Sequence, residues 1–176
     1  MFGLPDVAVG AVVAAFLTGI ISLLGLIISK EQKTSEYRQA WIDSLRSEIS
    51  QLIAHINVCY AMREQGEEDW SILRLDAIAV NQAAAQIKLR LNPEEKSSRK
   101  ILQHIEDLEV FIHTEETSFE RLNQIEEDLA ADAQALLKAE WVRVRRGELT
   151  FRVAKLCAAA MVVVILALLL VTPFLS

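Results

Sequence analysis

Two long stretches without a formal charge, one near each end of the chain, constrain the fold more than any other feature. The first covers residues 7–28 and the second covers about 156–174. Each stretch is long enough to cross the roughly 30 Å hydrocarbon core of a bilayer as a helix. The residues before the first stretch include no lysine or arginine, whereas a secretory signal peptide begins with a basic segment. We therefore expect two retained transmembrane helices.

Cationic residues flank both stretches on the side of the central segment. Lys30, Lys33 and Arg38 follow the first stretch. The second stretch has a basic belt that we expect to face lipid, formed by Arg143, Arg145, Arg146, Arg152 and Lys155. Cationic flanks stay in the cytoplasm. The sequence therefore predicts a multi-pass protein of the bacterial inner (cytoplasmic) membrane, with both termini periplasmic, a cytosolic central domain and the lipid bilayer as a partner.

The charge distribution also divides the chain. Apart from Asp6, no charged residue lies outside 30–155. We expect an N-terminal transmembrane helix over 1–29, a cytosolic helical bundle with a membrane-proximal stalk over 30–151, and a C-terminal transmembrane helix over 152–176. The net charge of −6 argues against DNA as a partner, because duplex-binding proteins present a basic face.

Four segments of the central domain carry apolar residues at steps of three and four, which places them on one face of an α-helix. The first two helices, from Thr34 and over 71–91, have the stripes Tyr37, Trp41, Leu45, Ile49, Leu52, Ile56 and Tyr60, and Leu73, Ala77, Val80, Ala84, Ile87 and Leu91. The third, over 93–113, and the fourth, after Thr117, have the stripes Ile101, Ile105, Leu108 and Ile112, and Leu122, Ile125, Leu129, Ala133, Leu136, Leu137, Trp141 and Val144. Short loops favour antiparallel neighbours. We expect an all-α fold in which two transmembrane helices flank an up-down-up-down four-helix bundle, with the outer helices continuous with the spans.

Helix boundaries have local signals. Asn92 is the expected N-cap of the third helix, with Pro93 as its first residue. Thr117 and Glu120 have the spacing of a capping box for the fourth helix. Gly147 is the one helix-weakening residue in the predicted stalk, where we expect a bend.

The second helix carries more apolar surface than one bundle face requires. Ile72, Leu75, Ile78 and Ala79 widen its stripe. Core packing and a subunit interface both account for this surface.

In an up-down-up-down bundle, acidic and basic residues of the loops would lie at opposite ends. The loops far from the membrane form an acidic tip that includes Glu67, Glu68, Glu115 and Glu116. The loop nearest the membrane is flanked by Lys88, Arg90, Lys96, Arg99 and Lys100. The basic residues at this end of the bundle, which we call the basic base, would be attracted to an anionic cytoplasmic leaflet. The acidic tip is a candidate site for a cytosolic protein partner.

Below the bundle, the two outer helices should form a two-helix stalk. Trp41 and Trp141 lie at comparable distances from their spans. We expect the two rings to lie near one another, either closing the base of the bundle or forming part of a contact between subunits.

The first span has a face of small residues. Its candidate oligomer or pore-lining residues are Ala11, Ala15, Thr18, Gly19 and Ser22. In lipid, small residues allow helices to approach closely. The face is expected to serve either self-association or packing against the second span of the same chain.

No residue pattern predicts catalysis or a cofactor. The chain has no Gly-rich phosphate loop, HExxH motif, paired CxxC or nucleophile elbow. Glu109 and His113 share a helix face, but two ligands do not make a metal site. We therefore expect no enzyme activity, no cofactor and no metal, and we interpret Cys59 and Cys157 as small apolar residues.

Three segments carry a resemblance. They are EYRQAWIDSLRSEIS after the first stretch, LRLNPEE in the middle, and LLKAEWVRVRRGE before the second stretch. They resemble segments of small bacterial membrane proteins in which two spans enclose a cytosolic helical bundle. The resemblance covers most of the central domain and implies no substrate.

A weaker resemblance rests on Arg99 and His104, which match the R-x4-6-H pattern of HEPN ribonucleases. With the chain's size and first span, this degenerate pair is similar to the accessory membrane-pore proteins of RNA-targeting CRISPR systems. That resemblance implies oligomers that act in phage defence. The basic loop beside Arg99 accounts for the arginine equally well.

Together these features favour a non-enzymatic membrane protein that self-associates, with its bundle as a sensing or gating module. Membrane permeabilisation in antiphage defence is the expected setting. A monomeric anchor that recruits a cytosolic partner and a membrane-bound HEPN-like ribonuclease are the alternatives.

Overall fold

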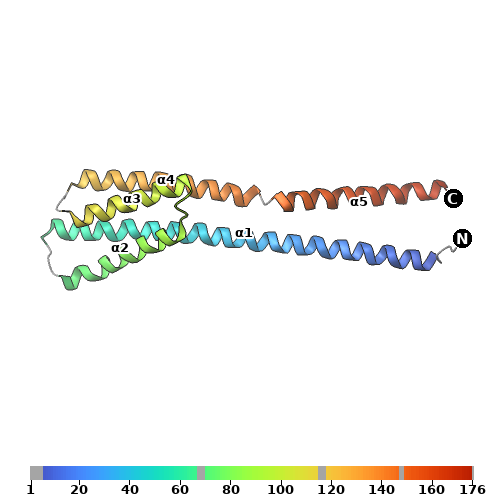
Figure 1. Ribbon diagram of the computed structural model, residues 1–176, viewed down its shortest axis with the longest axis horizontal. Helices are drawn as coiled ribbons and strands as arrows, with labels where there is room; N and C mark the ends of the chain where they lie inside the picture. Colours follow the sequence, from blue (N-terminus) through green and yellow to red (C-terminus); the bar gives the residue numbers. More distant parts are fainter. Residues whose placement is uncertain (1–5, 67–69, 115–117, 147–148, 176) are drawn as a thin grey trace. The chain divides into compact units, whose positions relative to one another are not determined.

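The structure, a computed structural model, describes residues 6–66, 70–114, 118–146 and 149–175. The described residues form only α-helices and the turns between them, so the predicted all-α class is confirmed (Figure 1). The helices are α1 (Asp6–Glu64), α2 (Trp70–Arg90), α3 (Lys96–His113), α4 (Phe119–Arg146) and α5 (Leu149–Leu175).

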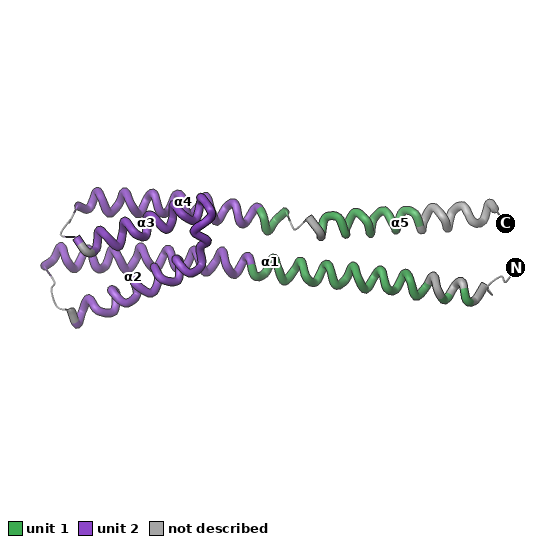
Figure 2. Tube along the Cα trace, viewed as in Figure 1, with its two compact units in different colours: residues 1–37, 143–176 green, residues 38–142 purple. Residues whose placement is uncertain are grey.

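The chain divides into two compact units (Figure 2). One unit is the helical bundle of residues 38–142. The other, which we call the paired-helix unit, combines residues 1–37 with 143–176. α1 contributes to both units as one uninterrupted helix, as predicted for the N-terminal outer helix.

Within the bundle, successive helices alternate in direction, as in the predicted up-down-up-down order (Figure 1). All four helices contribute to one apolar core. Its fully buried large side chains include Leu45 and Leu52 of α1, Ile87 of α2, Ile105 of α3 and Leu129 of α4. The helical spacing in the sequence therefore identified the central layer of the core.

Three apolar residues depart from the predicted stripes. Tyr37 is 75% exposed although it lies in register with Trp41 and Leu45, and Trp141 of α4 is 50% exposed. In α3 the deeply buried residue is Phe111, whereas Ile112 is only partly buried. The Phe111 ring lies 6.2 Å, between ring centroids, from the Tyr60 ring of α1.

The start of α3 differs from the prediction. Asn92 Oδ1 does accept a hydrogen bond from the Glu94 amide at 3.0 Å. The Asn92 carbonyl, however, closes a turn with the Glu95 amide at 3.2 Å, and the α-helix begins only at Lys96. The asparagine thus caps a turn before the helix, since its side chain competes for local backbone amides.

The structure describes the other outer helix in two parts, α4 to Arg146 and α5 from Leu149. The predicted continuity of this helix into the C-terminal span depends on residues 147–148, which lie outside the described residues, so it stays a prediction. At the other end of α4, the Ser118 hydroxyl accepts the Arg121 amide at 3.3 Å. Ser118 is therefore the cap, while Thr117 lies outside the described residues.

Candidate functional site

The paired-helix unit presents an apolar surface to its surroundings. Phe16, Ile21 and Leu26 of α1 are each 69% exposed. Among the described residues, α1 is the one helix long and apolar enough to cross a membrane, by length and composition. A continuous exposed apolar surface marks contact with lipid or with another protein. The second predicted span stays a prediction, because the side chains of residues 165–175 are not described.

α1 and α5 face one another along a seam of partly buried residues spaced by three and four. These are Leu17, Ile20, Leu24 and Ile27 of α1, and Phe151, Ala154, Ala158 and Met161 of α5. Large aliphatic side chains of α1 thus lie opposite small alanines of α5.

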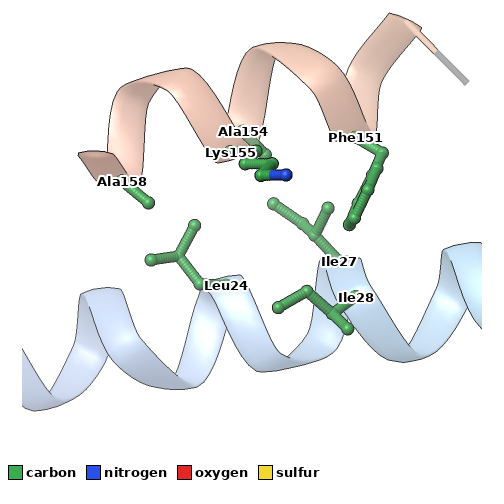
Figure 3. A pocket seen from close by; sticks show the side chains of 7 residues that line it. All are labelled: Leu24, Ile27, Ile28, Phe151, Ala154, Lys155 and Ala158. Atoms are coloured by element: carbon green, nitrogen blue, oxygen red, sulfur yellow. The ribbon is translucent and has the colours of Figure 1, made fainter. Parts of the chain in front are cut away.

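A cavity of about 220 Å³ lies in this seam, between α1 and α5 (Figure 3). Its lining consists of Leu24, Ile27, Ile28, Phe151, Ala154, Lys155 and Ala158. Lys155 is the one residue of this lining with a charged group. The cavity is smaller than most small-molecule sites, and its lining supplies no set of polar groups that would orient a cofactor.

The small-residue face of α1 is not the face that α5 covers. Ser22 and Leu24 are two positions apart, which is about 200° around an α-helix. Leu24 lies in the seam with α5, whereas all five predicted interface residues are exposed. They are Ala11, Ala15, Thr18, Gly19 and Ser22. Within this unit, packing against α5 is therefore carried by the larger residues.

The two hydroxyl groups on the small-residue face bond to their own helix. Thr18 Oγ1 donates to the Ala14 carbonyl and Ser22 Oγ donates to the Thr18 carbonyl, each at 2.8 Å. Both hydroxyl protons are thus satisfied without water or a partner. Such bonds allow serine and threonine to lie in an apolar surrounding.

The residues of the predicted basic belt are all exposed. They are Arg143, Arg145, Arg146, Arg152 and Lys155. Contact of these residues with lipid headgroups stays a prediction.

The two stalk tryptophans have different surroundings. Trp41 is partly buried and packs against the bundle core, whereas Trp141 is 50% exposed. The predicted proximity of the two rings stays a prediction, and the bend expected at Gly147 lies outside the described residues.

The HEPN-like pair is not brought together. Arg99 and His104 are five residues apart on α3, which puts them about 140° apart around the helix. Arg99 is exposed, whereas His104 is 19% exposed and its Nε2 lies 3.0 Å from Asp132 Oδ2 of α4. The pKa of Asp132 is lowered, first by the hydrogen bond from His104 and then by that from Lys100. His104 therefore links α3 to α4 through Asp132, and a joint role of Arg99 and His104 stays a prediction.

Ion pairs across the bundle account for three of the cations predicted to face the membrane. Lys88 Nζ donates to both carboxylate oxygens of Glu109 at 2.7 Å, and Lys100 Nζ donates to Asp132 Oδ1 at 2.9 Å. Arg90 binds Glu48 through two parallel hydrogen bonds, Nε to Oε2 at 2.9 Å and Nη2 to Oε1 at 2.5 Å. The basic base is thus partly neutralised within the bundle. The helical spacing gave no signal for these partners, which lie on other helices.

A second cluster of polar side chains includes residues near the C-terminal end of α1. His55 Nδ1 lies 2.7 Å from Asp76 Oδ1 of α2. Burial raises the pKa of the nearby Cys59 thiol, and the Asp76 charge raises it further. A thiol with a raised pKa stays protonated and is a poor nucleophile.

Glu126 of α4 is a partly buried carboxyl group that accepts a hydrogen bond from Asn57 Nδ2 at 2.8 Å. Burial raises the pKa of Glu126, and the Asn57 hydrogen bond opposes that rise. The folded chain therefore binds this proton more readily than the unfolded chain. Stability from this group is present at low pH and is lost as the pH rises through the folded pKa.

We expect Glu126→Gln to stabilise the bundle at neutral pH, because the amide removes a partly buried charge and still accepts from Asn57. The expected rise in the Tm of the detergent-solubilised full-length protein, followed by tryptophan fluorescence, is no more than about 3 °C. The gain should shrink as the pH falls toward the ordinary glutamate value of about 4.3. Glu127→Gln, at the exposed neighbouring position, is the control. An equal gain in the control, or a loss in Glu126→Gln, would contradict the assignment.

Among the described residues, no group of three or more His, Cys, Asp or Glu side chains is placed to hold a metal ion. Glu109, one member of the weak metal pair, is bound to Lys88, and the His113 side chain lies outside the described ones. No family model, curated protein or solved structure matches the chain.

Proposed function

We propose that this chain is a non-enzymatic, multi-pass protein of a bacterial inner membrane that self-associates, with its cytosolic bundle as a sensing or gating module. Membrane permeabilisation in phage defence is the setting that this proposal favours. Both termini would be periplasmic.

The exposed apolar surface of α1 is the observation that carries the proposal. No residue from 7 to 28 carries a formal charge, and Phe16, Ile21, Leu23 and Leu26 are 57–69% exposed. Its hydroxyl groups are satisfied within the helix, as a lipid-exposed helix requires. Lipid removes this surface from water at no cost to backbone hydrogen bonding.

α5 supports a second span. Leu156 is 71% exposed, and Val162, Val163 and Val164 are 56–64% exposed. These valines occupy consecutive positions, so they point in several directions around the helix. A helix that is apolar on all sides is suited to a membrane rather than to one face of a soluble bundle.

Self-association is supported by the uncovered small-residue face. α5 packs against the large residues of α1, so the alanines, Gly19 and Ser22 are left available to a helix of another copy. Because lipid supplies no hydrophobic force that drives helices together, they associate through the close packing that small residues allow.

A gating role follows from the extent of α1. The same uninterrupted helix carries the apolar stretch and the core residues Leu45 and Leu52. A rearrangement of the bundle core therefore displaces residues of a helix that also enters the bilayer. This covalent continuity is the proposed route by which a cytosolic signal reaches the membrane.

Extraction from membranes tests the proposal. Wild-type protein should stay in the pellet after washing with alkaline carbonate. A variant with two arginines in each span, Phe16→Arg/Ile21→Arg and Val162→Arg/Val164→Arg, should be released, because each arginine near the centre of a span costs about 2.5–3.5 kcal/mol.

The matched control places the same four charges on exposed bundle positions: Gln39→Arg, Ser47→Arg, Gln51→Arg and Gln103→Arg. The control should remain in the pellet. Protease added to spheroplasts should leave the bundle intact, and the detergent-solubilised particle should exceed the mass of one chain. Release of the wild-type protein by carbonate would overturn the membrane assignment, and a strictly monomeric particle would overturn self-association.

A further inference from the structure

The cavity between α1 and α5 lies where the apolar part of each helix meets its charged part. On α1 the lining residues lie within 24–28, at the end of the first uncharged stretch and just before Lys30. On α5 they lie within 151–158, around Lys155, where the second uncharged stretch begins. Two segments distant in sequence therefore place the cavity at the same boundary, which in a membrane is the interface between acyl chains and headgroups.

The inner surface of the cavity is apolar. Ala154 and Ala158 of α5 contribute only a methyl group each, and they leave space opposite Leu24 and Ile27 of α1 (Figure 3). A bound water needs two to four polar partners, which this lining does not provide. An apolar cavity of about 150 Å³ already holds a ring as large as benzene. The cavity of about 220 Å³ is therefore large enough for several methylene groups of an acyl chain.

Lys155 adds one charged group to this apolar lining. The residue is exposed, and Figure 3 shows its nitrogen turned toward the Phe151 end of the cavity, which is the charged end of α5. Among the described residues, no carboxylate forms an ion pair with the Lys155 ammonium. A lysine stem can lie along an apolar surface while its ammonium reaches the level of the headgroups. The cavity thus combines an apolar interior with a cation at its edge.

The neighbouring segments of the paired-helix unit have an excess of positive charge. Residues 29–37 and 143–155, which flank or include the lining, contain seven lysines and arginines but three glutamates. Basic pockets between transmembrane helices on the cytoplasmic side are suited to anionic lipid headgroups. A zwitterionic headgroup has no net charge and therefore gains less from this excess. The charge around the cavity favours an anionic lipid.

We propose that this cavity binds one acyl chain of an anionic glycerophospholipid, with the lipid phosphate beside the Lys155 ammonium. The proposal rests on the membrane insertion proposed above and adds a specific lipid to it. A free phosphate would match only the cation, and an apolar side chain of a second copy would match only the lining. A phospholipid matches both, because its phosphate and its acyl chains meet at the interface where the cavity lies.

Native mass spectrometry of the detergent-solubilised full-length protein tests the selection of the headgroup. The protein is titrated with phosphatidylglycerol and, separately, with phosphatidylcholine that has the same acyl chains. We expect one phosphatidylglycerol per chain to bind at least about fivefold more tightly than phosphatidylcholine, which is the effect of one cation near a membrane surface. Lys155→Gln should remove most of this preference, and Lys155→Arg should keep it because it keeps the charge.

Lys33→Gln is the matched control for the charge. Lys33 is exposed and lies nine residues after Leu24, which is about 180° around α1. The variant changes the net charge by the same amount on the side away from the cavity, so the lipid preference should match that of the wild type. An equal loss of preference in Lys33→Gln and Lys155→Gln would show that total charge selects the lipid, and would overturn the site.

Ala158→Leu tests the binding of the acyl chain, because the larger side chain would fill part of the cavity. It should weaken phosphatidylglycerol binding about tenfold, which corresponds to the displacement of about two methylene groups. Ala159→Leu adds the same volume at the exposed neighbouring position, about 100° around α5, and should leave the affinity unchanged. Glycerol 3-phosphate, which has no acyl chain, should not displace the lipid.

The outcomes separate this proposal from membrane insertion in general. Equal affinity for the two lipids, in a wild-type protein that stays in the carbonate-washed pellet, would overturn the lipid site and leave membrane insertion intact. Release of the wild type by carbonate would overturn both. A lower particle mass with an unchanged lipid count in Ala158→Leu would mean that a second copy fills the cavity. Displacement of the lipid by glycerol 3-phosphate would indicate a phosphate site alone, and either result would overturn the lipid proposal.

Discussion

Replacement of Arg90 by methionine is expected to lower the free energy of unfolding of the bundle by about 3–5 kcal/mol. Glu48 is only 8% exposed, and the described structure gives its carboxylate two hydrogen bonds from Arg90. Removing the guanidinium leaves a buried charge without its counter-ion. The measurement is thermal unfolding of the full-length protein in detergent, followed by tryptophan fluorescence.

The double variant Glu48→Met/Arg90→Met is the control for this prediction. It removes both charges and keeps apolar volume at both positions, so its stability should return close to that of the wild type. A double variant as unstable as Arg90→Met would show that methionine packing, rather than the unpaired carboxylate, causes the loss. The hydrogen bonds of Arg90 to Glu48 also raise the pKa of the guanidinium, so lowering or raising the pH within the neutral range should not mimic the substitution.

Replacement of Leu108 by alanine should destabilise the bundle by about 2–5 kcal/mol and lower the Tm by roughly 10–20 °C. Leu108 is 1% exposed and lies in the single core shared by all four bundle helices. Alanine leaves a cavity that the surrounding helices fill only partly. Hydrogen exchange should show the loss of protection across the whole bundle, because its helices share this core.

Val110→Ala, two residues further along α3, is the matched control. Val110 is 62% exposed, so its truncation should change the stability by no more than about 0.5 kcal/mol. A large effect at Val110 would instead mean that this side chain is buried against another molecule. Membrane extraction of Leu108→Ala should match the wild type, since the apolar stretches are unchanged.

Much of the bundle follows from local sequence. Leu45, Ile49, Leu52 and Ile56 repeat with the period of an α-helix, and all four are buried. The same holds for α4, whose predicted stripe is buried from Leu122 to Leu136. A period of three and four identifies the inner face because an amphipathic helix gains stability by burying its one apolar side.

Helical periodicity predicts less about the candidate sites. Arg99 and His104 fit a motif in the linear sequence, but the turn of the helix separates them and Asp132 engages His104. The sequence predicts a basic base that faces the membrane, whereas Lys88, Arg90 and Lys100 of that group have carboxylate partners on other helices. A motif or a charge count contains no information about which residue of another helix lies at the same height.

Sequence alone determined the two uncharged stretches, the four amphipathic segments and the small-residue face of α1, because each is a periodic or compositional property of neighbouring residues. Tertiary structure decided that α5 covers the large face of α1, that Glu48 is paired with Arg90, and that Leu75 and Leu89 of α2 stay exposed. These outcomes depend on the rotation and axial position of one helix against another. Many residues distant in sequence set both quantities together through the shape of the packed core.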